Sequence, residues 1–248
     1  MAGHSKWTNI KHRKEHQDAK KGKIFTKLVR ELTVAVRHGG SDPCYNPCLR
    51  IALDKAFRVN MRRDIIDRAI ASAIGSTNTS NMMELSYEGY GPQGVAVIVE
   101  CITDNRNRTA AAVRHIFSKY GGTLGTDGSV AYLFERKGQI TFAPGVSEDA
   151  LMEAAIKASA NDVVINEDNS IVVFVSFTSF YSVYNYLEVS GFKVATAEIV
   201  MLSTVSAKVD LDNAQKVLKM LDMLEGLDDV QNVYSNANVS RSAVKQLD

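Results

Sequence analysis

The residues of this sequence with the clearest capacity for chemistry are cationic and aromatic side chains near its start. Residues 1–40 carry ten Lys and Arg against three acids, four of the five histidines and the only tryptophan, Trp7. Lys and Arg neutralise phosphates and an indole ring stacks on a base, so this combination is typical of a nucleic-acid contact. A solvated charged tail would not need Trp7. The side chains expected to bind are His4, Ser5, Lys6, Trp7, Lys11, His12, Arg13, Lys14, Lys20, Lys21, Lys23, Lys27 and Arg30.

The segment of residues 5–23 has almost nothing to bury, so we expect it to be mobile alone and ordered by an anionic partner. It contains His12, Glu15 and His16 at the spacing of one group of zinc peptidases, in which two histidines bind the metal. A catalytic zinc site needs rigid supporting contacts, which such a segment cannot provide. We therefore interpret both histidines as additional donors in the basic segment.

A second set of cations, Arg106 and Arg108, lies in residues 103–109, where a predicted strand turns into a predicted helix. Positive charge at a helix N-terminus is unfavourable by about 0.3–1 kcal/mol per residue, so an anion bound there would compensate. We expect a phosphate contact at this turn. The alternative is that these arginines pair with Asp104 or Glu100.

Two further arginines, Arg62 and Arg63, precede a predicted helix. Arg68 lies four residues from Asp64, a spacing that favours an intrahelical ion pair. Arg62 and Arg63 have no such obvious partner, so both are added to the candidate nucleic-acid contacts.

Other kinds of site are weakly supported. The glycine-rich stretches at residues 87–94 and 121–128 run into strands, whereas phosphate-binding loops run into helix N-termini, so we interpret both as turns. Cys44 and Cys48 lack a second Cys/His pair at zinc spacing. Residues 174–177, Phe-Val-Ser-Phe, match only half of an RNA-stacking strand and are expected to be core aromatics. We predict no catalytic residue, metal, cofactor or small-molecule substrate.

The elements that must position these side chains follow from hydrophobic periodicity. Three one-sided helical patterns occur: the first ends at Gly39-Gly40, the second follows the cap pair Asn46-Pro47, and the third ends at Gly75. They predict a three-helix domain with a linker at residues 76–80. Beyond it the pattern predicts four strand–helix–strand units. Their ranges are 95–101, 109–120 and 130–134; 139–142, 148–159 and 163–166; 171–177, 180–189 and 194–202; and 205–209, 211–224 and 230–233.

The order of these units predicts an α+β multidomain protein. The second and third units are joined by a short turn at residues 167–170 and form a ferredoxin-like βαββαβ domain. The first and fourth units must then pair across it. We predict a basic segment and three-helix domain at residues 1–80, a split ferredoxin-like α+β domain at 81–136 and 204–248, and an inserted one at 137–203.

The formal net charge of +1 hides a strong polarity between these domains. Residues 1–80 carry 16 Lys and Arg against seven acids, a net +9, whereas the split domain carries −3 and the insert −5. The sequence therefore predicts that one end faces nucleic acid and the other does not.

Several classes of protein are excluded. The longest aliphatic runs, residues 95–99 and 171–175, fall far short of the ~20 residues of a membrane span. The start lacks the apolar stretch of a secretory signal, and three cysteines suit a reducing compartment. We expect a cytoplasmic protein.

The opening Met-Ala-Gly-His-Ser-Lys-Trp closely resembles the start of the YebC family, and further motifs agree in order along the chain. These motifs are Gly39-Gly40 with Asp42-Pro43, Asn60-Met61, Arg68-Ala69-Ile70, and residues 87–92, 103–109 and 125–130. The sequence departs at Arg62, where the family usually has Pro, at Cys44 and Cys48, and at residues 157–162, which lack an acidic step.

This resemblance implies a helical N-terminal domain, two α+β domains with one inserted in the other, and nucleic-acid binding without enzymatic chemistry. Some members are described as DNA-binding transcriptional regulators. Relatives, including a mitochondrial translational activator of cytochrome oxidase, act at the ribosome. A DNA-binding transcriptional regulator is the expected function, with a ribosome-associated translation factor binding rRNA or tRNA as the alternative.

Overall fold

A computed structural model describes residues 17–75 and 82–239 of the chain. It divides into two compact units, Met1–Phe134 with Ser203–Asp248, and Glu135–Leu202. The second unit begins two residues before the predicted insert of residues 137–203 and ends one residue before its end. None of the described helices combines the length and apolar character needed to cross a membrane.

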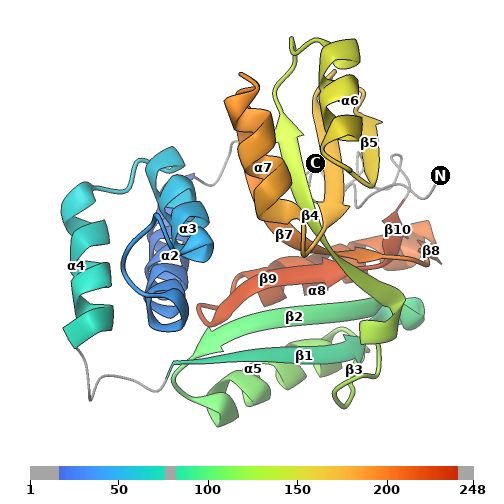
Figure 1. The fold of residues 1–248 in the computed structure, drawn as a ribbon. Helices are drawn as coiled ribbons and strands as arrows, with labels where there is room; N and C mark the ends of the chain where they lie inside the picture. Colours follow the sequence, from blue (N-terminus) through green and yellow to red (C-terminus); the bar gives the residue numbers. More distant parts are fainter. Residues whose placement is uncertain (1–16, 76–81, 240–248) are drawn as a thin grey trace. The chain divides into compact units, whose positions relative to one another are not determined.

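The N-terminal part of the first unit consists of the three predicted helices, α2 (Gln17–Gly39), α3 (Pro47–Arg58) and α4 (Arg63–Gly75). Helix α2 lies between the other two (Figure 1). Their apolar faces bury Leu28, Leu32, Leu49 and Ile66. The prediction that residues 5–23 are unordered alone is wrong for the part from Gln17, because α2 starts there. Lys, Ala and Gln are good helix formers, and a helix nucleated by its buried face propagates readily through them.

The start of α3 is set by one buried polar side chain, Asn46. Its Oδ1 accepts from the backbone N–H of Leu49 at 3.0 Å, which caps the helix as the sequence predicted. Its Nδ2 donates to the carbonyls of Ala35 at 2.8 Å and Gly40 at 2.7 Å. Asn46 therefore joins the end of α2 to the beginning of α3.

The α+β part of the first unit is built on a sheet of order β3-β1-β2-β9, in which every pair is antiparallel. Its strands are β1 (Met83–Tyr90), β2 (Ala96–Thr103), β3 (Thr123–Leu124) and β9 (Val230–Ser235). The pairing of β2 with β9 joins the two halves of the split domain. Two short parallel strands, β8 (Ala207–Val209) and β10 (Ala237–Val239), form a separate ladder, and η1 (Pro92–Gly94) and η2 (Ala131–Leu133) are single 3₁₀ turns.

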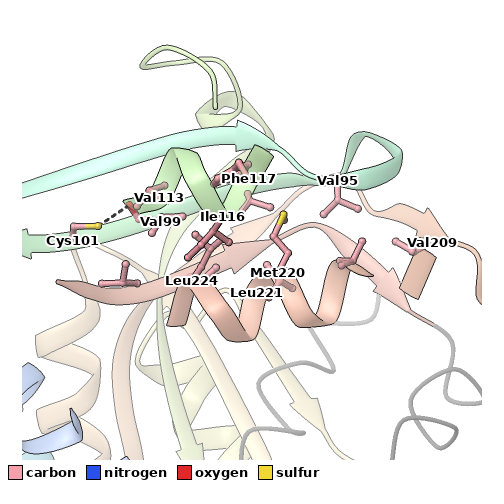
Figure 2. Packing of buried hydrophobic residues seen from close by; sticks show 14 of the residues in the cluster. Val95, Val99, Cys101, Val113, Ile116, Phe117, Val209, Met220, Leu221 and Leu224 are labelled. Atoms are coloured by element: carbon pink, nitrogen blue, oxygen red, sulfur yellow. Dashed lines mark hydrogen bonds between the residues drawn. The ribbon is translucent and has the colours of Figure 1, made fainter. Parts of the chain in front are cut away.

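One face of this sheet is covered by α5 (Arg106–Lys119) and α8 (Leu211–Glu225). Figure 2 shows the resulting core, to which Val99 of β2, Phe117 of α5 and Leu221 of α8 all belong. Because residues from both halves of the split domain fill the same core, neither half can bury its apolar face alone.

Two local predictions in this domain are wrong. Residues 87–90, interpreted as a turn, belong to β1, whose Leu85 and Tyr87 pack on the core. Residues 130–134, predicted as a strand, form η2 and only the first residue of β4. The reason is Glu88, whose buried carboxylate accepts from three backbone N–H groups of residues 128–131 and curls that segment.

The second unit contains β4 (Phe134–Phe142), α6 (Glu148–Lys157), β5 (Asp162–Ile165), β6 (Ile171–Ser176), α7 (Phe180–Val189) and β7 (Val194–Ser203). Its sheet order, β5-β6-β4-β7, is that of a ferredoxin-like βαββαβ domain, as predicted. The α+β part of the first unit departs from this plan. Its β1 lies beside β2, at the position that the plan gives to the strand before the second helix, which here is α8. The predicted α+β class with a helical N-terminal region is confirmed.

The aromatic strand motif of the second unit divides between core and surface. Phe174 is buried, as expected for a core aromatic. Phe177 is instead 40% exposed, and the guanidinium of Arg136 lies 4.3 Å from its ring centroid. The prediction of a buried residue is therefore wrong for Phe177, because it follows the end of β6.

Candidate nucleic-acid interface

Most of the basic N-terminal segment lies outside the part of the chain that the structure describes. This applies to His4, Ser5, Lys6, Trp7, Lys11, His12, Arg13 and Lys14. Lys20 and Lys21 belong to helix α2, but their side chains are outside the described set. The candidate contacts whose side chains are described are Lys23, Lys27, Arg30, Arg62, Arg63, Arg106 and Arg108.

Three of these, Lys23, Lys27 and Arg30, lie on one face of α2 and bind the C-terminal end of α8. Lys23 Nζ donates to the carbonyl of Gly226 at 2.7 Å, and Lys27 Nζ donates to that of Glu225 at 2.8 Å. The last carbonyls of a helix have no intrahelical partner and carry partial negative charge, so cations stabilise this end. The structure therefore gives these lysines an intramolecular role that periodicity alone did not suggest.

Arg30 continues the same contact into the loop between α8 and β9. Its guanidinium donates to the carbonyls of Asp228 and, at 3.5 Å, of Ile102, and its Nη1 lies 3.1 Å from Oδ1 of Asp229. The side chains of Arg30 and Asp229 are 16% and 11% exposed. This is a largely desolvated ion pair between α2 and the α+β part of the first unit.

Asp229 is the centre of a polar cluster that the sequence analysis missed. Its Oδ2 accepts from Thr109 Oγ1 at 2.8 Å and from Arg108 Nη2 at 3.0 Å. Burial alone would raise the pKa of Asp229, but the hydrogen bonds from Thr109 and Arg108 and the charges of Arg108 and Arg30 hold it below its usual value. The carboxylate is thus ionised at neutral pH. The signal in the sequence that could have found this cluster was the position of Asp229, an acid directly before a strand.

The turn that leads into α5 is a closed hydrogen-bonded unit. Thr103 Oγ1 accepts from the backbone N–H of Asn105 at 3.0 Å and lies 2.9 Å from Thr109 Oγ1, the hydroxyl that donates to Asp229. Asn105 caps α5 by accepting from the N–H of Arg108 at 3.0 Å. These bonds fix the backbone positions of Arg106 and Arg108.

The two arginines of this turn differ in their surroundings. Arg108 Nη2 lies 2.8 Å from Asp104 Oδ1 as well as contacting Asp229, so the alternative of pairing with Asp104 is realised for this residue. Hydrogen bonds with Asp229 and then Asp104 raise the pKa of Arg108. Glu100 accepts instead from Asn232 and Tyr234. Arg106 is exposed, and its backbone carbonyl accepts from Tyr87 Oη at 3.2 Å.

At the start of α4, Arg62 has a partner that the sequence analysis did not assign. Asp64 lies 3.0 Å from Arg62 Nε and 2.7 Å from Arg68 Nη2, so one carboxylate serves both arginines. The predicted pairing of Asp64 with Arg68 is confirmed. Within residues 17–75 and 82–239, Arg63, Arg106 and Arg114 are exposed cations without an ion pair.

An open depression of about 420 Å³ lies over the Asp229 cluster. Its lining includes Arg30, Asp104, Arg108 and Asp228. Arg30, Arg108, Asp104 and Asp229 are paired with one another here, so the arrangement holds elements of the first unit together. Among the described residues no three His, Cys, Asp or Glu side chains are placed to hold a metal ion.

Comparison with known proteins gives consistent results over the whole chain. Residues 5–76 match a family model described as the TACO1/YebC protein N-terminal domain, and residues 82–237 match one described as the TACO1/YebC second and third domain. The chain is similar to proteins named "Probable transcriptional regulatory protein" from Pseudomonas fluorescens, at 71% identity, and Pseudomonas putida, at 69% identity, with 100% of each chain covered.

A solved structure is also similar. The crystal structure of a conserved hypothetical protein from Aquifex aeolicus matches with a TM-score of 0.86 and 44% sequence identity, covering 96% of this chain and 98% of that one. The match extends over both compact units, so the arrangement of helical and α+β elements along the chain is shared by the two proteins.

Proposed function

The chain belongs to the TACO1/YebC family, and from this premise we propose that it is a non-enzymatic regulatory protein that binds nucleic acid, with duplex DNA as its target. The observation that carries the proposal is the concentration of positive charge at one end of the chain. Residues 1–22 hold six Lys and Arg against two acids, together with Trp7. Such a segment combines phosphate neutralisation with a stacking surface.

The described part of the chain supports the assignment of nucleic-acid binding to the N-terminal segment. Lys23, Lys27, Arg30 and Arg108 are engaged within the protein, whereas Arg63, Arg106 and Arg114 are exposed. We assign the main contact to the N-terminal segment and a supporting one to the exposed arginines. The acidic insert, at −5, would be repelled by a phosphate backbone and stays off the nucleic acid.

The name of the Pseudomonas relatives supports the regulatory role, and the proposal places the protein in the cytoplasm. The three cysteines are free thiols, which is the usual state in a reducing compartment.

A second candidate function is that of a ribosome-associated translation factor that binds rRNA or tRNA. The observation that favours it is the charge of α4, the helix that follows the short turn after α3. It carries two arginines and two aspartates, and one of those aspartates already binds two arginines. A helix that reads bases in the major groove presents donors to the DNA, and α4 is poorly suited to that role.

Crosslinking in cells, followed by sequencing of both DNA and RNA, separates the two candidates. Recovery of discrete duplex sites supports the DNA-binding regulator. Recovery of rRNA or tRNA, with cosedimentation on ribosomes that is lost when Lys6, Trp7 and Lys14 are changed to Ala, supports the translation factor. Binding to DNA without any sequence preference would count against a regulator of transcription.

A further inference from the structure

The contact between α2 and the end of α8 uses three cations that a nucleic-acid-binding protein would present to phosphates. We propose that this contact is autoinhibitory: it occupies Lys23, Lys27 and Arg30 in the free protein, and a phosphate backbone competes with the α8 carbonyls and Asp229 for them. The inference rests on the proposed function, because it adds these three cations, which are engaged in the free protein, to the proposed nucleic-acid contacts.

The spacing of the three cations suits either partner. Lys23, Lys27 and Arg30 are separated by four and three residues, so they form one stripe along a helix. In the structure this stripe meets the carbonyls of Glu225, Gly226 and Asp228 and one carboxylate, that of Asp229. A helix C-terminus offers about half an elementary charge, whereas each phosphate of a nucleic acid offers a full one. A backbone laid along the stripe is therefore the stronger electrostatic partner.

The α8 side of the contact tolerates release of the cations. Lys23 donates at an exposed position, and water can replace the ammonium at the carbonyl of Gly226. Asp229 would keep its hydrogen bonds from Thr109 and Arg108 after Arg30 leaves, because these go mainly to Oδ2 whereas Arg30 binds Oδ1. No buried charge is left without a partner, which is the usual penalty for breaking such a pair.

Two substitutions of equal charge separate this role from a general electrostatic effect. Asp229→Asn and Asp104→Asn each remove one carboxylate that binds Arg108, but only Asp229 also binds Arg30. The full-length variants are titrated with a labelled DNA duplex at several salt concentrations. We expect Asp229→Asn to bind at least threefold more tightly than Asp104→Asn at the same salt concentration. Equal affinity of the two variants would overturn the inference.

A third substitution tests whether Arg30 is the cation released. Adding Arg30→Gln to Asp229→Asn should lower the slope of log affinity against log salt by about 0.9, the value for one phosphate contact. Between 50 and 200 mM salt, the affinity of the double variant should therefore fall by a factor about 3.5-fold smaller than that of Asp229→Asn. An unchanged slope would show that Arg30 does not reach the nucleic acid and would contradict the proposal.

Two further measurements guard against a folding defect in Asp229→Asn. In the free protein, amide hydrogen exchange in α2 should be faster in Asp229→Asn than in Asp104→Asn, and equal rates would contradict a released contact. Replacing the more accessible Lys23 and Lys27 together by Gln should lower the wild-type salt slope by about 1.8, since two phosphate contacts are lost. An unchanged slope indicates a purely structural role and overturns the inference.

The same experiments distinguish failure of the inference from failure of the proposed function. A wild-type chain that binds neither duplex DNA nor structured RNA refutes the proposed function and the inference with it. A wild-type chain that binds, with no difference between Asp229→Asn and Asp104→Asn, refutes only the autoinhibitory contact.

Discussion

Replacing Glu88 by Gln should destabilise the first unit more than any change to an exposed acid on the same strand. Glu88 is 7% exposed, and its carboxylate accepts from the backbone N–H groups of Gly128, Val130 and Ala131, each at 2.8 Å. Oε1 serves Gly128, whereas Oε2 serves the other two. An amide has one oxygen, so at least one N–H would face an NH₂ group in the variant.

The size of the effect follows from this count. A hydrogen bond to a charged group contributes about 1.5–3 kcal/mol, and the bonds that remain lose their charge assistance. We expect the free energy of unfolding to fall by about 2–4 kcal/mol at pH 7. Glu84→Gln is the matched control, because Glu84 lies on β1 as well but its side chain is 54% exposed. It should change stability by less than about 0.5 kcal/mol.

The difference should also depend on pH with a defined sign. Burial alone would raise the pKa of Glu88, but the three backbone hydrogen bonds lower it below the ordinary 4.5. A carboxylate with a lowered pKa stabilises the folded state fully above 4.5 and loses this contribution as the pH falls through its folded-state value. The gap between wild type and Glu88→Gln should therefore be constant near neutrality and narrow below pH 4.5.

Urea unfolding followed by circular dichroism measures the global effect, and amide hydrogen exchange of residues 125–133 measures the local one. If Glu88→Gln unfolds at the same urea concentration as Glu84→Gln, with unchanged exchange in this segment, then the buried carboxylate does not hold the segment and the reasoning is wrong.

Three other predictions concern single positions. Asn46→Ala should lower the free energy of unfolding by about 2–3 kcal/mol in urea denaturation, since it removes a helix cap and the hydrogen bonds that Asn46 donates to two carbonyls; a loss below about 0.5 kcal/mol would contradict this. Burial, with the nearby charge of an aspartate, raises the pKa of the Cys101 thiol to about 12, so a thiol reagent at pH 8 should titrate only Cys44 and Cys48 in the folded protein and all three after denaturation. Gly138→Ala should destabilise the second unit by about 1–3 kcal/mol in thermal unfolding, because the added Cβ would overlap a ring carbon of Phe180; an unaltered melting temperature would refute it.

The helices and most strands could be predicted because their signals are local. Asn46-Pro47 marks a cap and a first turn, and one-sided apolar periodicity marks the helix that follows. The pairing of β2 with β9 could be predicted by elimination, since the inserted βαββαβ unit is complete without them.

The parts that could not be predicted depend on partners far apart in the sequence. Nothing near Glu88 indicates that its carboxylate binds the backbone 40 residues later and turns a strand-like segment into a 3₁₀ turn. Lys23, Lys27 and Arg30 were likewise assigned to nucleic acid from their charge, because their partner, the end of α8, lies about 200 residues away in the sequence, as the separation of 198 between Lys27 and Glu225 shows. The charge of these residues was evident from the sequence, but the surface they contact was not.

The central claim, that the basic N-terminal segment carries nucleic-acid binding, is tested most directly by the salt dependence of duplex affinity. The full-length chain is compared with a full-length variant in which Lys6, Lys11, Arg13 and Lys14 are changed to Gln. We predict that the slope of log affinity against log salt falls by about 3.6, the value for four phosphate contacts, and that affinity at physiological salt is largely lost. A slope and an affinity unaltered by the four substitutions would contradict the account.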